Sequence, residues 1–263
     1  MSCKVIVLAI PGIGTQPIGF SNKLMDDVDK LSKGTVLENS YCVEEALPFK
    51  KTNVDANQSE LLKRLGRNNQ LGGMLSLRKL VVNAFGDGVT FESGANRSDS
   101  VYRKVHEYLR RRIIEVNIKM SENEGAKLVV VAASMGVHLL STYIWDADNS
   151  KGIFESNGAT DNDNLRNLDY LFSLGCNIPL FISGKSVQDI VPIDKRNANF
   201  KWDNYYDRDD VLGWPLADIN EAYGALVKDY EINAGSYIGS HVRYWNDNDF
   251  TKPFVNSLIN LLD

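Results

Sequence analysis

Residues Leu128–Gly136 read LVVVAASMG, an unbroken apolar run that ends in a serine set among small residues. A half-buried strand alternates apolar and polar residues, whereas Leu128–Val131 carries no polar residue at all. Such strands are typical of a parallel sheet, because the crossover helices that join parallel strands cover both of its faces. The stretch therefore predicts a central strand of an α/β protein.

On both sides of this stretch, along the 263-residue chain, short apolar runs alternate with longer segments whose apolar residues recur at the spacing of a helix. We predict strands at Val5–Ile10, Thr35–Leu37, Leu80–Phe85, Leu128–Ala132, Tyr170–Leu174 and Trp202–Tyr205. We predict helices at Asn22–Leu31, Leu61–Lys79, Ser100–Met120, Gly136–Trp145 and Leu216–Asp229. This order predicts a single domain over residues 1–263, a three-layer αβα sandwich around a mostly parallel sheet, with little or no cap domain.

Ser134 lies where the apolar strand gives way to an apolar helix. A serine on a sharp strand-to-helix turn exposes its hydroxyl above the sheet, and small neighbours such as Ala132 and Gly136 let the strand and the helix pack closely. The amide of Met135 would lie at the helix N-terminus, where it can stabilise a developing oxyanion. We interpret Ser134 as a nucleophile; the alternative is a serine that only caps the helix.

An activated serine needs a histidine within hydrogen-bond reach, and the chain holds three histidines. His106 lies among charged residues on a long predicted helix and is interpreted as a solvated surface residue. His138 follows Ser134 by one turn of the same helix, so we expect it beneath the turn as a near-core residue. Elimination leaves His241, in a late loop-like segment that can reach over the edge of the sheet.

The histidine needs an acid that fixes its tautomer, and two aspartates compete for this role. Asp210 follows the predicted strand at residues 202–205, at the kind of position where parallel sheets bind ligands. Asp189 precedes Ile-Val-Pro, a common arrangement at the end of a strand. We favour Asp210, keep Asp189 as the alternative acid, and interpret Asp207 and Asp209 as solvated turn residues.

Three segments imitate binding loops but lack a required residue. Pro17 stands where a dinucleotide fingerprint that begins at Gly12 needs its third glycine. Pro179 stands where a phosphate-binding loop that ends at Ser186 needs its first glycine. A calcium loop that begins at Asp161 lacks both its glycine and its closing glutamate. Nucleotide and calcium sites are therefore disfavoured.

Composition narrows the classes of function further. With 34 acidic and 29 basic residues and no basic block, the chain has little to neutralise a phosphate backbone, so nucleic acid is disfavoured as a partner. Cys3, Cys42 and Cys176 are widely spaced, and we expect neither a disulfide nor a zinc site.

No apolar run approaches the length of a membrane span, and we expect a cytoplasmic protein. A homodimer is compatible with such a domain, but no exposed apolar stretch commits the sequence to one.

Five stretches, in order, resemble an α/β-hydrolase, and more narrowly an uncharacterised lipase- or esterase-like group of serine hydrolases. They are Gly12–Gln16, Ser134–Gly136, Leu174–Leu180, Trp202–Asp210 and Ser240–His241. The resemblance implies hydrolysis of an ester or thioester through an acyl-enzyme, with no metal or organic cofactor. Only about twenty polar residues separate the helix after Ser134 from the next strand, too few for a large apolar lid, so we expect a small or medium acyl group. Ser134 would be the nucleophile, His241 the base and Asp210 the orienting acid, in the order that this fold uses.

The sequence departs from that group at two places. Pro11 replaces the histidine that opens the first loop, and Ala132-Ala133 replace the Gly-His before the serine. Because Pro11 has no N–H, the second oxyanion donor would be the amide of Gly12 or Ile13. These departures favour the rival interpretation, a catalytically degraded hydrolase scaffold that binds a ligand or a protein, whereas the complete set of serine, acid and histidine argues against it.

Overall fold

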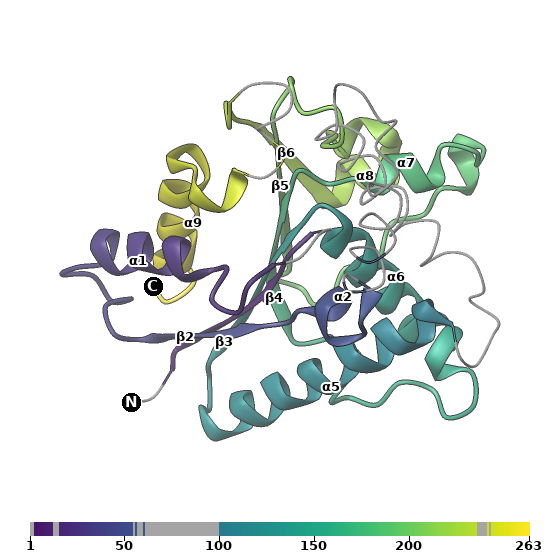
Figure 1. Cartoon of the computed structure of the whole chain (residues 1–263). Coiled ribbons are helices and arrows are strands. Elements are labelled where there is room, and N and C mark those ends of the chain that lie inside the picture. Colours follow the sequence, from purple (N-terminus) through teal and green to yellow (C-terminus); the bar gives the residue numbers. More distant parts are fainter. Residues whose placement is uncertain are drawn as a thin grey trace.

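The computed structural model of the protein describes residues 3–12, 16–54, 56, 60, 100–235, 241 and 243–263. Within these ranges six strands form one sheet in the order β2-β1-β3-β4-β5-β6, and all neighbouring strands run parallel. The strands are β1 (Val5–Ile10), β2 (Tyr41–Glu45), β3 (Lys127–Ala133), β4 (Leu168–Leu174), β5 (Lys201–Tyr206) and β6 (Val227–Glu231). The predicted α/β class with a central parallel sheet is confirmed (Figure 1).

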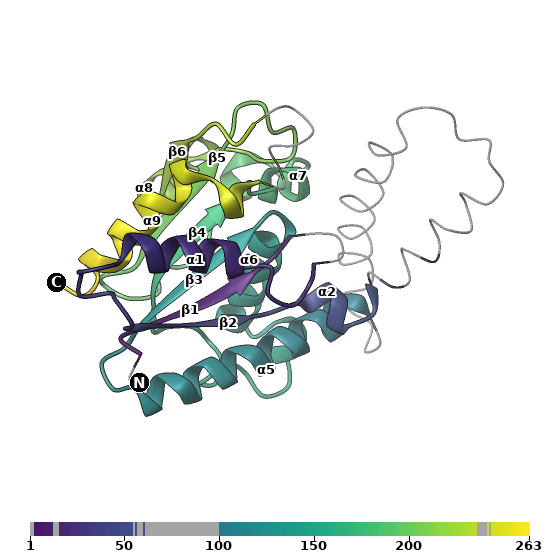
Figure 2. The ribbon, with the colours of Figure 1, turned by 60° about the vertical axis from the view of Figure 1, so that its left-hand side comes forward.

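Helices cover both faces of this sheet. They are α1 (Asn22–Leu31), α2 (Pro48–Lys51), α5 (Val101–Glu122), α6 (Met135–Asn149), α7 (Ile178–Ile182), α8 (Glu221–Leu226) and α9 (Asn248–Asn260). In Figure 2, α1 and α9 lie side by side on one face of the sheet, and α5 and α6 cover the other. Val5 and Val7 of β1 belong to the core under α1 and α9. Ile6, Leu8 and Ile10 belong to the core under α5 and α6, so this strand has no solvated face and its sequence is continuously apolar.

The strand order brings the ends of β1 and β3 together at a switch in direction. From β1 the chain moves outward to β2, whereas from β3 it moves the opposite way, through β4 and β5 to β6. Open α/β sheets bind their ligands in the crevice that such a switch leaves at the carboxyl ends of the strands. The segments that begin at Pro11 and Ser134 meet at this crevice.

Two predicted elements are wrong. Thr35–Leu37 is a turn, because Thr35 Oγ1 donates to Ser32 O at 2.7 Å and accepts from Leu37 N at 3.3 Å. Local side-chain bonds of this kind compete with strand pairing, and the strand itself comes later, as β2. The predicted helix Leu216–Asp229 holds the short α8, but residues 227–231 pair with β5 as strand β6.

The predicted helix Leu61–Lys79 and strand Leu80–Phe85 lie outside the described residues, and the single-domain prediction over 1–263, which includes them, stays a prediction. Over the ranges that are described, we find no helix whose length and hydropathy would let it span a bilayer.

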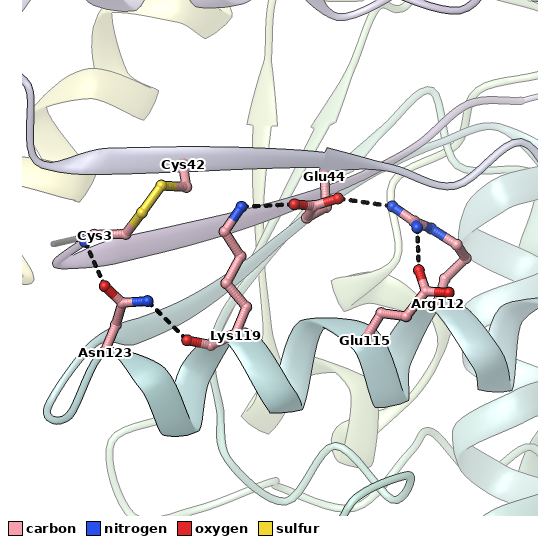
Figure 3. A network of polar contacts seen from close by, with 7 residues as sticks. All are labelled: Cys3, Cys42, Glu44, Arg112, Glu115, Lys119 and Asn123. Atoms are coloured by element: carbon pink, nitrogen blue, oxygen red, sulfur yellow. Dashed lines mark hydrogen bonds and ion pairs between the residues drawn. A yellow bond between two sulfur atoms is a disulfide. The ribbon is translucent and has the colours of Figure 1, made fainter. Parts of the chain in front are cut away.

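A disulfide joins Cys3, just before β1, to Cys42 in β2, with Cα atoms 5.7 Å apart (Figure 3). The prediction of no disulfide is therefore wrong. The two cysteines are 39 residues apart and form no sequence motif. They meet because β1 and β2 pair in parallel, with Val5 opposite Tyr41. Cys176 is a free and buried thiol.

Ion pairs hold the same edge strand to α5 (Figure 3). Glu44 of β2 accepts hydrogen bonds from Lys119 Nζ at 2.7 Å and from Arg112 Nη2 at 2.8 Å. Nearby, Cys3 N donates to Asn123 Oδ1, at the end of α5, at 2.7 Å. Among the described residues β2 is an edge strand, which has a strand partner on one side only. Here its attachment is reinforced by a covalent bond and by charged side chains.

Candidate active site

Ser134 occupies the turn between β3 and α6. Its backbone has φ 50° and ψ −124°, a region that is unfavourable for non-glycine residues and is concentrated at functional sites. Its amide donates to Leu174 O at 2.8 Å, which fixes the turn against the end of β4. The predicted strand, sharp turn and helix are all present, so Ser134 lies at the carboxyl edge of an interior strand.

Close packing explains the glycines on both sides of Ser134. A Cβ at Gly136 would lie 2.5 Å from Pro11 O, and a Cβ at Gly12 would lie 2.7 Å from Ser134 Cβ. Real Cβ atoms essentially never approach other atoms so closely. The atom near Gly136 belongs to the main chain of Pro11, and the atom near Gly12 belongs to Ser134 itself. Glycine at these positions lets α6 begin directly beside the segment that follows β1.

His241 connects Ser134 with Asp210. Its Nε2 lies 2.7 Å from Ser134 Oγ, and its Nδ1 lies 2.8 Å from Asp210 Oδ2. When the serine hydroxyl donates to Nε2, the neutral ring carries its proton on Nδ1 and donates it to the carboxylate. The serine is 107 residues from the histidine in sequence, and the aspartate is 31 residues from it. The fold thus joins three separate segments in one chain of hydrogen bonds.

The carboxylate of Asp210 is buried and accepts further hydrogen bonds. Leu212 N donates to its Oδ1 at 2.9 Å, and Tyr244 OH donates to its Oδ2 at 2.9 Å. Burial raises the pKa of Asp210, but the hydrogen bonds from His241, Leu212 and Tyr244 and the charge of the imidazole outweigh burial and hold the pKa below its usual value. Asp210 is therefore an anion at neutral pH, suited to orient an imidazole and to stabilise its protonated form.

Tyr244 is a site residue that the sequence prediction missed. It is 1% exposed, and its hydroxyl also accepts a hydrogen bond from Asp207 N at 2.9 Å. Asp207 in turn accepts from Ala234 N at 2.6 Å and is 2% exposed, so the prediction of a solvated turn acid is wrong for it. The available signal was position, because Tyr244 comes three residues after His241.

The remaining predicted site residues take different places. Asp189 is exposed in a short 3-10 turn (Val187–Asp189), whereas His241 bonds to Asp210. Met135 is the first residue of α6, so its amide is among those that make no intrahelical hydrogen bond at a helix N-terminus. Gly12 lies against Ser134, and Ile13 lies outside the described residues.

The other two histidines are both buried. His138 is near the core, as predicted, and its ring stacks on Phe181 with 4.1 Å between centroids. His106 is fully buried between α5 and α6, with Nε2 3.2 Å from Thr142 Oγ1, so the prediction of a surface residue is wrong. Burial lowers the pKa of His106 to about 3. The charged residues that flank His106 in the sequence lie on other sides of α5. Their position next to His106 in the sequence therefore does not show that His106 itself is buried.

The described ranges contain no group of three or more His, Cys, Asp or Glu side chains that could hold a metal ion. In the segment that imitates a calcium loop, Asp163 is fully buried and pairs with Arg110 Nη2 at 2.5 Å. That carboxylate is thus part of the packing between α5 and the loop before β4.

No protein-family model and no curated protein matches the sequence. A solved structure from Xanthomonas campestris pv. campestris, assigned as a hydrolase of the α/β superfamily, aligns with 96% of this chain and 99% of its own, at 11% identity and a TM-score of 0.43. Dienelactone hydrolase from Anabaena variabilis aligns with 99% of this chain and 86% of its own, at 10% identity and a TM-score of 0.43. A cutinase-like protein from Cryptococcus sp. aligns with 99% of this chain and 96% of its own, at 9% identity and a TM-score of 0.43.

Proposed function

We propose that the protein is a serine hydrolase that cleaves a small-molecule carboxylic ester or thioester through an acyl-enzyme. The observation that carries this proposal is the continuous chain of hydrogen bonds from Ser134 Oγ through His241 to Asp210, at 2.7 and 2.8 Å. A serine hydroxyl is a weak nucleophile until an adjacent base takes its proton, and this geometry supplies the base and the acid that orients it. The alternative role, capping of α6, gains no support, because the Ser134 side chain makes no capping hydrogen bond.

In the acylation step Ser134 Oγ bonds to the carbonyl carbon of the substrate while its proton passes to His241 Nε2. The carbonyl oxygen becomes an oxyanion, and the imidazolium is stabilised by Asp210. His241 then gives the proton to the departing alcohol or thiol as its bond to the acyl carbon breaks. The acyl group remains on Ser134 Oγ as an ester.

In the deacylation step water takes the place of the leaving group. His241 Nε2 accepts a proton from the water, whose oxygen bonds to the acyl carbon, and returns that proton to Ser134 Oγ as the acyl bond breaks. The products are a carboxylic acid and the free serine. The scheme uses side chains, main-chain amides and water, and calls for neither a metal nor an organic cofactor.

The oxyanion needs hydrogen-bond donors at the carboxyl edge of the sheet. The amide of Met135, at the N-terminus of α6, is the first donor in the proposal. Pro11 cannot be the second, since proline has no N–H. The amide of Gly12 or Ile13 takes this role, and the close approach of Gly12 to the Ser134 side chain supports it.

The cellular location bears on the state of the disulfide. Disulfides persist in oxidising compartments and are rare in the cytosol, where thiols are kept reduced. The cytoplasmic location that the sequence predicts therefore implies free thiols at Cys3 and Cys42, whereas a location in an oxidising compartment implies the observed disulfide. Mass spectrometry of the alkylated, unreduced protein from its native source decides between the two.

Hydrolysis of p-nitrophenyl butanoate tests the proposal. The wild type should release nitrophenolate, and Ser134→Ala and His241→Ala should each lower kcat by about 10⁴-fold or more, because the two side chains act as one unit. The matched control is Ser186→Ala, which removes an exposed hydroxyl outside the site. A folded wild type that hydrolyses neither oxygen esters nor thioesters would contradict the proposal and favour the degraded scaffold.

A further inference from the structure

A cavity of about 290 Å³ lies between α6 and α7, and it takes no part in the chemistry proposed above. Its walls come mainly from these two helices, with Val191 and Ile193 and with Tyr223 of α8 closing it. Most of the lining side chains are aromatic or aliphatic. Ligand sites in proteins are typically concave and apolar with a few polar groups, which is the character of this cavity.

The cavity begins one helical turn from the nucleophile, at His138 of α6. α6 starts at Met135, directly after Ser134, and α7 starts four residues after Leu174, whose carbonyl accepts from the Ser134 amide. Both helices thus leave the same edge of the sheet, from the ends of the neighbouring strands β3 and β4. This is the edge at which open parallel sheets bind their ligands.

The two helices continue side by side away from Ser134. Near their first residues Asn177 Nδ2 lies 4.0 Å from Met135 Sδ, and one turn further on the ring of His138 stacks on Phe181 at 4.1 Å. His138 and Phe181 both line the cavity, as does Ile178 at the start of α7, and these residues form the end of the lining nearest to the serine along the two helices. On α6 the lining then continues through Ser141 to Trp145.

Charge in the cavity is confined to a few groups. The carboxylate of Asp146 accepts from Tyr102 OH at 2.7 Å and is 4% exposed. Lys185 is exposed and follows α7, and Trp145, next to Asp146 near the far end of the α6 wall, is 42% exposed. The lining between His138 and Ser141 therefore carries no Asp, Glu, Lys or Arg side chain, and the charged lysine lies toward the solvent.

From this arrangement we propose that the cavity between α6 and α7 binds the acyl chain of the substrate, and that the preferred substrates are esters of unbranched fatty acids with about eight carbons. The inference rests on the proposed serine hydrolase function, since it needs the acyl carbon at Ser134. It names the acyl group, which the triad geometry alone leaves open.

The length follows from the helix. At 1.5 Å of rise per residue, His138 lies about 6 Å and Ser141 about 10 Å along α6 from Ser134. An extended chain of single bonds advances about 1.2 Å per bond, as the dimensions of the polypeptide backbone show. An acyl chain of about five carbons therefore reaches His138, and one of about eight carbons reaches Ser141.

A series of p-nitrophenyl esters from acetyl to dodecanoyl, each below its aggregation concentration, tests the inference. For the wild type, kcat/KM should rise about fourfold for each methylene that enters the cavity and level off near octanoyl. Ser141→Phe fills the cavity from the α6 wall and Ile182→Trp fills it from the α7 wall. Each should lower the ratio of kcat/KM for octanoyl over acetyl by at least about tenfold.

The control is Ser121→Phe, the same substitution on the exposed surface of α5, which should keep the wild-type ratio. An active wild type with no preference for octanoyl over acetyl would overturn the inference while the proposed hydrolase function stands. The inference would also be overturned, with the proposed hydrolase function still standing, if Ser141→Phe and Ile182→Trp both fold and keep the wild-type ratio of kcat/KM for octanoyl over acetyl. A folded wild type that hydrolyses no ester of the series and fails to react with a fluorophosphonate overturns the proposed function, and this inference with it.

Discussion

Gly136→Ala tests whether the packing around the turn sets the position of Ser134. The new Cβ would lie 2.5 Å from Pro11 O and 2.9 Å from Ile10 O, both main-chain atoms that cannot rotate away. Ordinary contact begins at 3.4 Å, so the gap between α6 and the end of β1 must open by about 0.9 Å. A displacement of about 1 Å at a reacting group costs on the order of 100-fold in rate, and we expect kcat to fall by about that factor.

Stability gives the second measurement for this variant. Inside a helix, alanine in place of glycine normally stabilises by about 0.5–1 kcal/mol. Overpacking at a site that cannot yield costs about 1–3 kcal/mol, so the clash outweighs the helix preference and the free energy of unfolding in urea should fall. Gly184→Ala is the control, because its Cβ would meet no atom within 4 Å. If Gly136→Ala folded with wild-type kcat and wild-type stability, the reasoning about this turn would be refuted.

Three further predictions concern the acid, the disulfide and the buried histidine. Asp210→Asn should lower kcat by about 10⁴-fold, because an amide favours the wrong tautomer of the imidazole, while Asp189→Asn keeps the wild-type kcat; ester hydrolysis by the two matched variants measures the contrast. Cys42→Ser opens a cross-link that spans 39 residues and should lower the free energy of unfolding by about 4 kcal/mol in non-reducing urea titrations, with no such loss when both proteins are reduced. Burial lowers the pKa of His106 to about 3, so below pH 6.5 the unfolded chain binds a proton that the folded chain does not. This group should therefore lower the free energy of unfolding by about 1.4 kcal/mol per pH unit as the pH falls from 6.5 toward 3, a slope that urea unfolding of His106→Phe should lack.

The turn at Ser134 could be predicted from sequence because its signals are local. The apolar strand, the small residues and the apolar helix are adjacent in the chain, and each requires little knowledge of the rest of the fold. His241 was selected by elimination among three histidines, and Asp210 by its place after a strand. In the structure His241 is hydrogen-bonded to Ser134 and Asp210 is hydrogen-bonded to His241, whereas Asp189 is exposed.

The features that sequence reasoning missed depend on long-range contacts. Residues 227–231 form a strand because β5 offers them a free edge, and helical periodicity does not reveal that edge. His106 is buried by α6, and Cys3 meets Cys42 through the pairing of β1 with β2. Tyr244 shares the carboxylate of Asp210 only once its short 3-10 helix, Tyr244–Asn246, has packed beneath the loop after β5.

Reaction with an alkyl fluorophosphonate, followed by peptide mass spectrometry, tests most directly whether Ser134 is an activated nucleophile. An activated serine displaces fluoride from the reagent and keeps the phosphonyl group as a stable ester. The account predicts an adduct on Ser134 of the wild type that is absent from Ser134→Ala and strongly slowed in His241→Ala. A folded wild type that forms no adduct, or forms one on another serine at the same rate in all three proteins, would contradict it.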